Sequence, residues 1–179
     1  MAGALVVEPD RIEDERGFFA RTFASEKFAE HGLDARVEQC SISFNTRAGT
    51  LRGLHYQEAP HAEAKLVRCT RGAIYDVALD LRPDSPSYLR WAAVELSAED
   101  GRAFFIPEVC PHGFQSLLDA TEVLYQISTP YVPSAARGVR WDDPAFAIEW
   151  PEPPGERIMS ERDRSFPDYA PGAAARTTS

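Results

Sequence analysis

The sequence predicts a mainly β protein built as a sandwich or barrel of short strands. Short apolar or alternating runs recur at nearly regular spacing, Gly, Pro, Asn and Asp separate them, and only one segment has a helical pattern. The chain has 179 residues, of which 44% are hydrophobic, which is enough for one buried core and too little for two ordinary domains. We therefore expect a single domain over residues 1–170.

The expected strands, in chain order, fall around residues 4–7, 18–23, 38–45, 51–57, 66–69, 73–81, 90–96, 102–106, 113–118 and 122–131. One helix is expected from Ser25 to Gly32, with Ser25 as its N-cap and Gly32 at its end. Residues 97–100 predict a turn, and the segment 151–157, rich in Pro, Gly and Glu, predicts a surface loop. The small residues of 171–179 predict a disordered tail.

Composition argues against several classes of partner. The formal net charge of −9, from 28 acidic and 19 basic residues, opposes attraction to nucleic acid or to an anionic membrane. No run reaches the roughly 18 apolar residues of a membrane helix, and the first residues lack a basic signal region, so we expect a cytoplasmic protein. Cys40, Cys69 and Cys110 are widely spaced and are expected to be reduced structural thiols.

Two polar stretches stand inside apolar strand patterns. Arg52 and His55 are three residues apart and cannot lie on the same face of a regular strand, although Gly53 can supply a bulge that re-aims one of them. Lys65 is one of only two lysines, and it begins a strand suited to the interior. Taken singly, a strand histidine is often a satisfied core or surface residue, and a lysine at a strand end is usually solvated.

Other polar residues also keep an ordinary structural interpretation beside a functional one. His112 follows a turn framed by prolines, which suits either ligand binding or a tight corner. Tyr125 lies in an alternating strand, where an aromatic side chain usually packs. The charges of 159–164 would by default form a solvated face. Composition and periodicity leave these alternatives open.

Several motifs together resemble one family. They are Arg16-Gly17-Phe18-Phe19, Leu51-Arg52-Gly53-Leu54-His55, Lys65-Leu66-Val67-Arg68, Pro107-Glu108, His112-Gly113-Phe114, Tyr125, Trp141-Asp142-Asp143-Pro144 and Ser160-Glu161-Arg162-Asp163. In this order and spacing the chain resembles the dTDP-4-dehydrorhamnose 3,5-epimerases over about residues 5–168. The resemblance implies a cupin-type double-stranded β-helix (jelly roll) with a few short helices. It also implies a homodimer with strand exchange, a dTDP-linked sugar substrate, and neither a metal nor another cofactor.

The resemblance assigns roles to four residues in the epimerisation of a nucleotide-linked 4-keto-6-deoxyhexose. A ketone at C4 acidifies the hydrogens at C3 and C5, so inversion needs a base, a group that stabilises the enolate oxygen, and an acid on the opposite face. His55 matches the base and Asp163 its carboxylate partner. Lys65 matches the residue near the C4 oxygen, and Tyr125 matches the proton donor.

A second set matches positions that bind substrate: Arg16, Arg21, Gln39, Ser41, Arg52, His112, Arg137 and Arg162. Arginines suit a diphosphate because the guanidinium fork binds two oxygens at once. The chain departs from the family pattern at Arg21, at Cys40 and Ser41, and at Ala136, all outside the proton-transfer set. Reaction type is therefore better specified than substrate.

Four alternatives stay open. Inversion at C3 alone or C5 alone would use much of the same site, and a ketoisomerase would move the same kind of proton. A metal-dependent cupin could use His55, His61 and His112, although the chain lacks a His-x-His pair. A non-catalytic binder of sugar nucleotides would be expected to lack the base or the acid.

Overall fold

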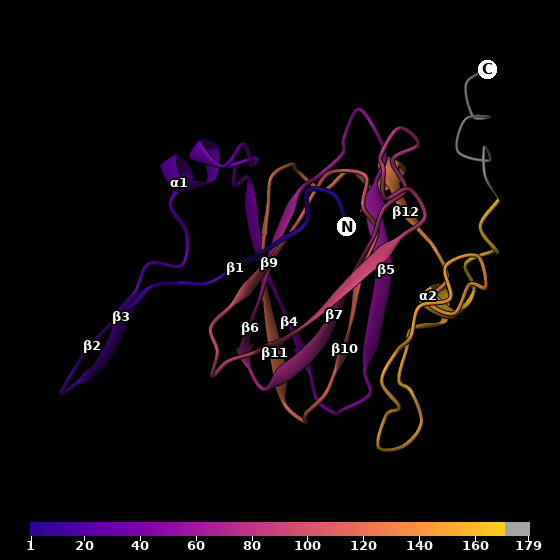
Figure 1. Ribbon diagram of the computed structural model, residues 1–179. Helices are drawn as coiled ribbons and strands as arrows, with labels where there is room; N and C mark the ends of the chain where they lie inside the picture. Colours follow the sequence, from indigo (N-terminus) through magenta and orange to yellow (C-terminus); the bar gives the residue numbers. More distant parts are fainter. Residues whose placement is uncertain (171–179) are drawn as a thin grey trace.

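Two five-stranded antiparallel sheets face each other in the computed structural model, which describes residues 1–170 (Figure 1). The first sheet has the order β1 (Leu5–Val7), β9 (Ala103–Ile106), β6 (Lys65–Arg71), β11 (Thr121–Ile127), β4 (Gln39–Asn45). The second has the order β12 (Ala136–Gly138), β5 (Leu51–Gln57), β10 (His112–Ser116), β7 (Ala73–Leu79), β8 (Trp91–Ser97). This mainly β architecture confirms the expected fold class. The predicted tail 171–179 lies outside the described residues.

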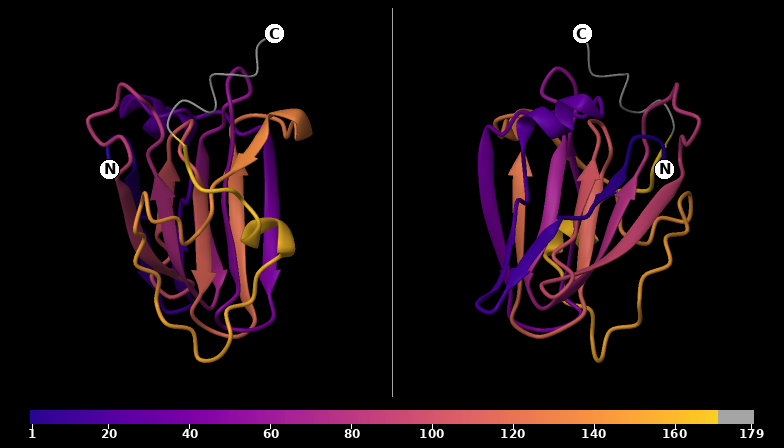
Figure 2. Two further views of the ribbon diagram at one scale, coloured as in Figure 1. Left: turned by 90° about the vertical axis from the view of Figure 1, so that its right-hand side faces the viewer. Right: turned by 60° about the vertical axis from the view of Figure 1, so that its left-hand side comes forward.

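Alternation along the strands divides the apolar side chains between the two faces of each sheet. In β7, Ile74 and Ala78 join the core between the sheets, whereas Val77 and Leu79 pack on the opposite face. The segment after β12 covers that outer face, where Phe146 packs, and it runs along the outside of the second sheet (Figure 2). Between the sheets, apolar side chains from strands of both sheets form a buried core.

Three helices complete the described chain: α1 (Ser25–Glu30), a 3₁₀-helix (Pro133–Ala135) and α2 (Glu161–Arg164). Phe28 of α1 packs against the outer face of the first sheet. The predicted N-cap was wrong, because Ser25 is the first helical residue and Ala24 occupies the cap without a side-chain hydrogen bond. The predicted end was correct, since Gly32 follows the helix at φ +69, a conformation that favours glycine.

A two-stranded hairpin of β2 (Arg11–Asp14) and β3 (Gly17–Ala20) projects away from the two sheets (Figure 1). Its large apolar side chains are exposed: Ile12 is 68% exposed, Phe18 58% and Phe19 65%. The strand predicted at 18–23 is observed as β3, which begins one residue earlier, at Gly17, and ends at Ala20. Apolar side chains this exposed mark a surface suited to a partner.

Candidate active site

A cavity of about 620 Å³ opens between the sheets, with walls from β4, β6 and β11 of the first sheet and β5 and β10 of the second. Residues 158–163 close one side of it. The predicted site residues found in this wall are Gln39, Ser41, Arg52, His55, Lys65, His112, Tyr125, Arg162 and Asp163. Residues that span more than 120 positions of sequence are thus brought together by the pairing of the strands.

The bulge expected at Gly53 is present, and it turns Arg52 and His55 into the same cavity. His112 of β10 lies opposite His55, and Phe114 lies opposite Arg52, so β5 uses three steps where β10 uses two. Gly53 has φ +129, and a Cβ atom there would lie 2.4 Å from the Cα of Gly113. Only glycine permits this approach of the two backbones.

His55 and Asp163 form a hydrogen-bonded pair at the wall of the cavity. His55 Nε2 lies 2.7 Å from Asp163 Oδ1, and the side-chain exposures are 41% and 6%. The imidazole faces the cavity while the carboxylate stands behind it. An imidazole that donates from Nε2 keeps its lone pair on Nδ1, where it can accept a proton.

Helix α2 fixes the position of Asp163. Ser160 caps this helix by accepting a hydrogen bond from Asp163 N at 3.1 Å. Burial alone would raise the pKa of Asp163, but hydrogen bonds from His55, Gly53 and Ser160 outweigh it, and the pKa lies below its ordinary value. The default expectation of a solvated face was therefore wrong for Asp163, whereas Arg162 is exposed.

Tyr125 reaches the cavity from β11, in the sheet that faces His55. Its ring centroid is 6.1 Å from that of His112, with the planes nearly perpendicular. Burial raises the pKa of Tyr125, and the negative charge of Asp76 raises it further. The phenol is therefore a neutral hydrogen donor at physiological pH.

His112 is closed off from solvent and held by a carboxylate that sequence reasoning missed. Its Nε2 lies 2.6 Å from Asp76 Oδ1, with side-chain exposures of 5% and 0%. Burial raises the pKa of Asp76, although His112 and Lys65 oppose this shift. Among the described residues, Asp76 Oδ2 has no hydrogen-bond partner. An aspartate inside the predicted strand 73–81 was the available signal, because buried acids need partners.

Lys65 connects the two sheets at the cavity. Its Nζ donates to His55 O at 3.0 Å and lies 3.0 Å from Glu63 Oε1. Lys65 is 7% exposed, so its charge acts where little water competes. Two further residues of the wall, Glu63 and Tyr131, were not singled out from the sequence. The signal for Glu63 was its place two residues before Lys65, since a buried lysine needs an acidic partner.

Three predicted substrate-binding residues lie outside this wall. Arg16 sits in the turn of the projecting hairpin and bonds to Asp14, and Arg21 follows that hairpin at an exposed position. Arg137 on β12 pairs with Glu58. A single chain therefore does not bring these arginines to the cavity.

The three histidines considered for a metal site, His55, His61 and His112, do not form a set of metal ligands. His55 and His112 each bond a different carboxylate, and His61 lies in the loop between β5 and β6. Within residues 1–170, no group of three or more His, Cys, Asp or Glu side chains is placed to hold a metal ion.

Comparison with known proteins decides the family. The family model described as dTDP-4-dehydrorhamnose 3,5-epimerase matches residues 1–170. The chain belongs to this family. It is 46% identical over 166 residues to the dTDP-4-dehydrorhamnose 3,5-epimerase of Methanothermobacter thermautotrophicus, a match that covers 92% of this chain and 88% of the relative. The predicted family, fold class and isomerase activity are thereby confirmed.

Solved structures agree with this assignment. The epimerase of Bacillus anthracis, with TDP and PPi bound, superposes with a TM-score of 0.89 at 37% identity, covering 93% of this chain and 94% of the other. A 3′-monoepimerase from Streptomyces bikiniensis in complex with dTDP-quinovose gives a TM-score of 0.85 at 35% identity, covering 93% and 83%. The fold is thus shared by enzymes that differ in the number of centres inverted. No helix among the described residues is long and apolar enough to cross a membrane.

Proposed function

We propose that the cavity epimerises a dTDP-linked 4-keto-6-deoxyhexose at C3 and C5, with His55 as the base and Tyr125 as the acid. The observation that carries this proposal is the placement of the two residues on facing sheets, with a carboxylate behind the imidazole. A sugar ring between the sheets presents one face to each residue. Removal of a proton from one face and return to the other inverts the carbon.

Lys65 is the group proposed to stabilise the enolate. Proton loss from C3 or C5 moves negative charge onto the C4 oxygen, and a fixed ammonium in a poorly hydrated cavity stabilises this charge more than water would. Its buried position between the sheets supports this role. His112, whose imidazole is held by Asp76, is proposed to bind a sugar oxygen beside it.

The nucleotide is proposed to lie toward the exposed arginines of the cavity wall. Arg52 and Arg162 are exposed, and Gln39 and Ser41 of β4 line the same cavity. Guanidinium groups bind two diphosphate oxygens at once, which favours a nucleoside diphosphate as the part of the substrate that binds there. Because the Streptomyces relative is a 3′-monoepimerase, inversion at C3 alone is the second candidate.

We propose further that two chains associate and that the projecting hairpin carries Arg16 to the partner's cavity, with Arg21 at the entry. The support is the exposed apolar surface of the hairpin and the place of Arg16 outside the wall of the cavity in its own chain. Light scattering should give twice the chain mass. Arg16→Ala should then raise KM more than it lowers kcat, and a monomeric, fully active protein would exclude this arrangement.

We also propose that the protein is cytoplasmic. All three cysteines are free thiols, and two of them are buried, as in proteins of reducing compartments.

Deuterium uptake tests the proposed function directly. Protein treated with a chelator is incubated with dTDP-4-keto-6-deoxyglucose in D₂O, and C3 and C5 are followed by NMR. Uptake at both carbons is expected, uptake at one would favour mono-epimerisation, and no uptake by folded protein would overturn the proposal. His55→Ala should abolish exchange, whereas Tyr125→Phe should reduce product formation more than the first proton loss.

A further inference from the structure

Glu63 is a buried carboxylate that faces the cavity beside Lys65. Glu63 Oε1 lies 3.0 Å from Lys65 Nζ, and the two side chains are 8% and 9% exposed. Glutamate and lysine are seldom so buried unless they pair, because each charge loses its hydration. The pair is therefore a built part of the site, and neither residue is a solvated surface charge.

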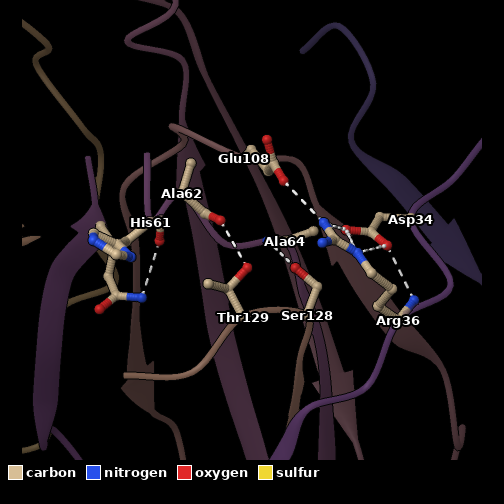
Figure 3. Close-up of polar contacts among 9 residues, drawn as sticks. Asp34, Arg36, His61, Ala62, Ala64, Glu108, Ser128 and Thr129 are labelled. Atoms are coloured by element: carbon tan, nitrogen blue, oxygen red, sulfur yellow. Dashed lines mark hydrogen bonds and ion pairs between the residues drawn. The ribbon is translucent and has the colours of Figure 1, made fainter. Parts of the chain in front are cut away.

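The backbone on both sides of Glu63 is tied to the segment that follows β11. Ala62 O accepts a hydrogen bond from Thr129 Oγ1 at 2.8 Å, and Ala64 N donates to Ser128 Oγ at 2.8 Å (Figure 3). These two hydrogen bonds, one on each side of Glu63, restrict the backbone of residues 62–64. The carboxylate of Glu63 is therefore held at a fixed place in the wall.

The second oxygen of Glu63 is also bonded. Glu63 Oε2 accepts from Gln57 Nε2 at 2.9 Å. Gln57 is 1% exposed, and its Nε2 also lies 3.1 Å from His61 O and from Pro130 O, so its two N–H groups are shared among three acceptors. Its Oε1 accepts from Val132 N. Because both ends of the Gln57 amide are fixed, the Glu63 carboxylate has a set orientation as well as a set position.

These contacts dictate the orientation of the Lys65 ammonium. An ammonium has three N–H donors. One is directed to Glu63 and one to His55 O, which leaves a single donor for the cavity that Lys65 shares with His55 and Tyr125. Without Glu63, the flexible four-carbon side chain could direct its charge elsewhere.

We infer that Glu63 is a positioning residue for the reaction, which aims the remaining N–H of Lys65 at the oxygen where the enolate charge develops. The inference rests on the proposed function. Glu63 also balances the charge of Lys65, so that Lys65 acts locally as a hydrogen-bond donor and contributes little to attraction of the diphosphate. Arg52 and Arg162 attract the nucleotide instead. Loss of Glu63 should therefore lower kcat and leave KM nearly unchanged.

The test compares Glu63→Gln, Lys65→Ala and the double variant. Glu63→Gln keeps the size of the side chain and removes its charge. We expect its kcat to fall by about 10- to 100-fold, with KM within about threefold, since misplacement of a reacting group costs up to about 10²-fold. In the Lys65→Ala background the same change should have no further effect, because Glu63 acts only through Lys65.

Two further variants separate positioning from folding. Thr129→Val removes the hydrogen bond to Ala62 O while keeping the ion pair, and it should lower kcat in the same direction by a smaller factor. Within residues 1–170, Glu108 forms an ion pair with Arg36 alone, at 3.5 Å (Figure 3), so Glu108→Gln removes a carboxylate outside the cavity wall and should leave kcat unchanged. Should Glu63→Gln fail to fold, Thr129→Val still decides the question.

Three results would overturn the inference: wild-type kcat in folded Glu63→Gln, an equal loss from Glu63→Gln in the Lys65→Ala background, or wild-type kcat in Thr129→Val. If the losses of kcat from Glu63→Gln and Lys65→Ala were additive in the double variant, Glu63 would act independently of Lys65, through the structure of the surrounding wall. Absence of deuterium uptake in the wild type would refute the proposed function itself. An active wild type with an unaffected Glu63 variant refutes only the role of Glu63.

Discussion

Asp163→Asn tests the coupling between His55, the proposed catalytic base, and its carboxylate partner. The substitution keeps the shape of the side chain and removes the negative charge that lies 2.7 Å from His55 Nε2. His55 becomes positively charged when it accepts a proton from the sugar. The carboxylate therefore stabilises the transition state more than the ground state, and its loss should lower kcat more than it raises KM.

The magnitude follows from the burial of the pair. Asp163 is 6% exposed at its side chain, so solvent replaces little of the lost interaction. A hydrogen bond to a charged group contributes about 1.5–3 kcal/mol. At about 1.36 kcal/mol for each factor of ten, Asp163→Asn should lower kcat by roughly 10- to 150-fold.

The rate of deuterium uptake at C3 and C5 measures this effect. Circular dichroism and thermal unfolding of the same samples control for folding. A folded Asp163→Asn protein with a wild-type exchange rate would refute the role of the pair, as would a change confined to KM.

The same substitution predicts a pH dependence of stability. The pKa of Asp163 is lowered in the folded protein, so its contribution is present above the unfolded value of about 3.9 and disappears as the pH falls through the folded pKa. The unfolding free energies of wild type and Asp163→Asn should therefore differ by a constant amount at neutral pH. Urea titrations should show that this difference shrinks below about pH 4.

Three further predictions concern stability and thiol reactivity. Asp80 has a fully buried side chain, and hydrogen bonds from a guanidinium and two hydroxyls hold its pKa well below the ordinary value even though burial opposes this shift. Asp80→Asn should lower the urea-unfolding free energy by about 3 kcal/mol at neutral pH, and by less below about pH 4 as the wild-type carboxylate protonates. Gly53→Ala should cost at least about 2 kcal/mol and abolish deuterium uptake, because its Cβ would collide with the facing backbone; a stable, active variant would contradict the bulge geometry. Burial raises the pKa of Cys69 to about 11 and that of Cys110 to about 12, so iodoacetamide at about pH 8 should modify neither thiol in native protein, and mass spectrometry should find the label only on exposed Cys40.

The strands of the two sheets were predictable where burial imposes a pattern. Residues 73–79 alternate between the two faces of the second sheet, and both faces are covered, so the run is apolar throughout except at Asp76. Strand β2 was missed because all four of its residues are exposed, which removes the contrast between faces. Strand β12 was missed because its sequence, Ala-Arg-Gly, has neither β-branched nor aromatic side chains, and all three residues are half-buried.

The site was predictable only in part, because some of its residues lie in segments without a local sequence pattern. Arg52 and His55 broke an apolar pattern and could be noticed, and Gly53 indicated how they could share a face. Asp163 lies in a charged four-residue helix, where local sequence gives no sign of burial. Its role came from the family resemblance, and its contact with His55 joins residues 108 positions apart. Contacts between residues so far apart in the sequence depend on tertiary packing and leave no local signal in the sequence.

The two histidine–carboxylate pairs of the cavity illustrate how burial separates their roles. The imidazole of His55 is 41% exposed, so it can take a proton from the sugar and exchange it with water. The His112 pair is closed, and burial raises the pKa of its Asp76, so this pair is suited to hold a sugar oxygen and poorly suited to exchange protons. Burial also raises the pKa of Tyr125, so its phenol stays protonated at neutral pH, as the proposed role of proton donor requires. The exposed His55 pair and the half-buried phenol of Tyr125 come from facing sheets, and this arrangement supports the proposed inversion of a carbon held between them.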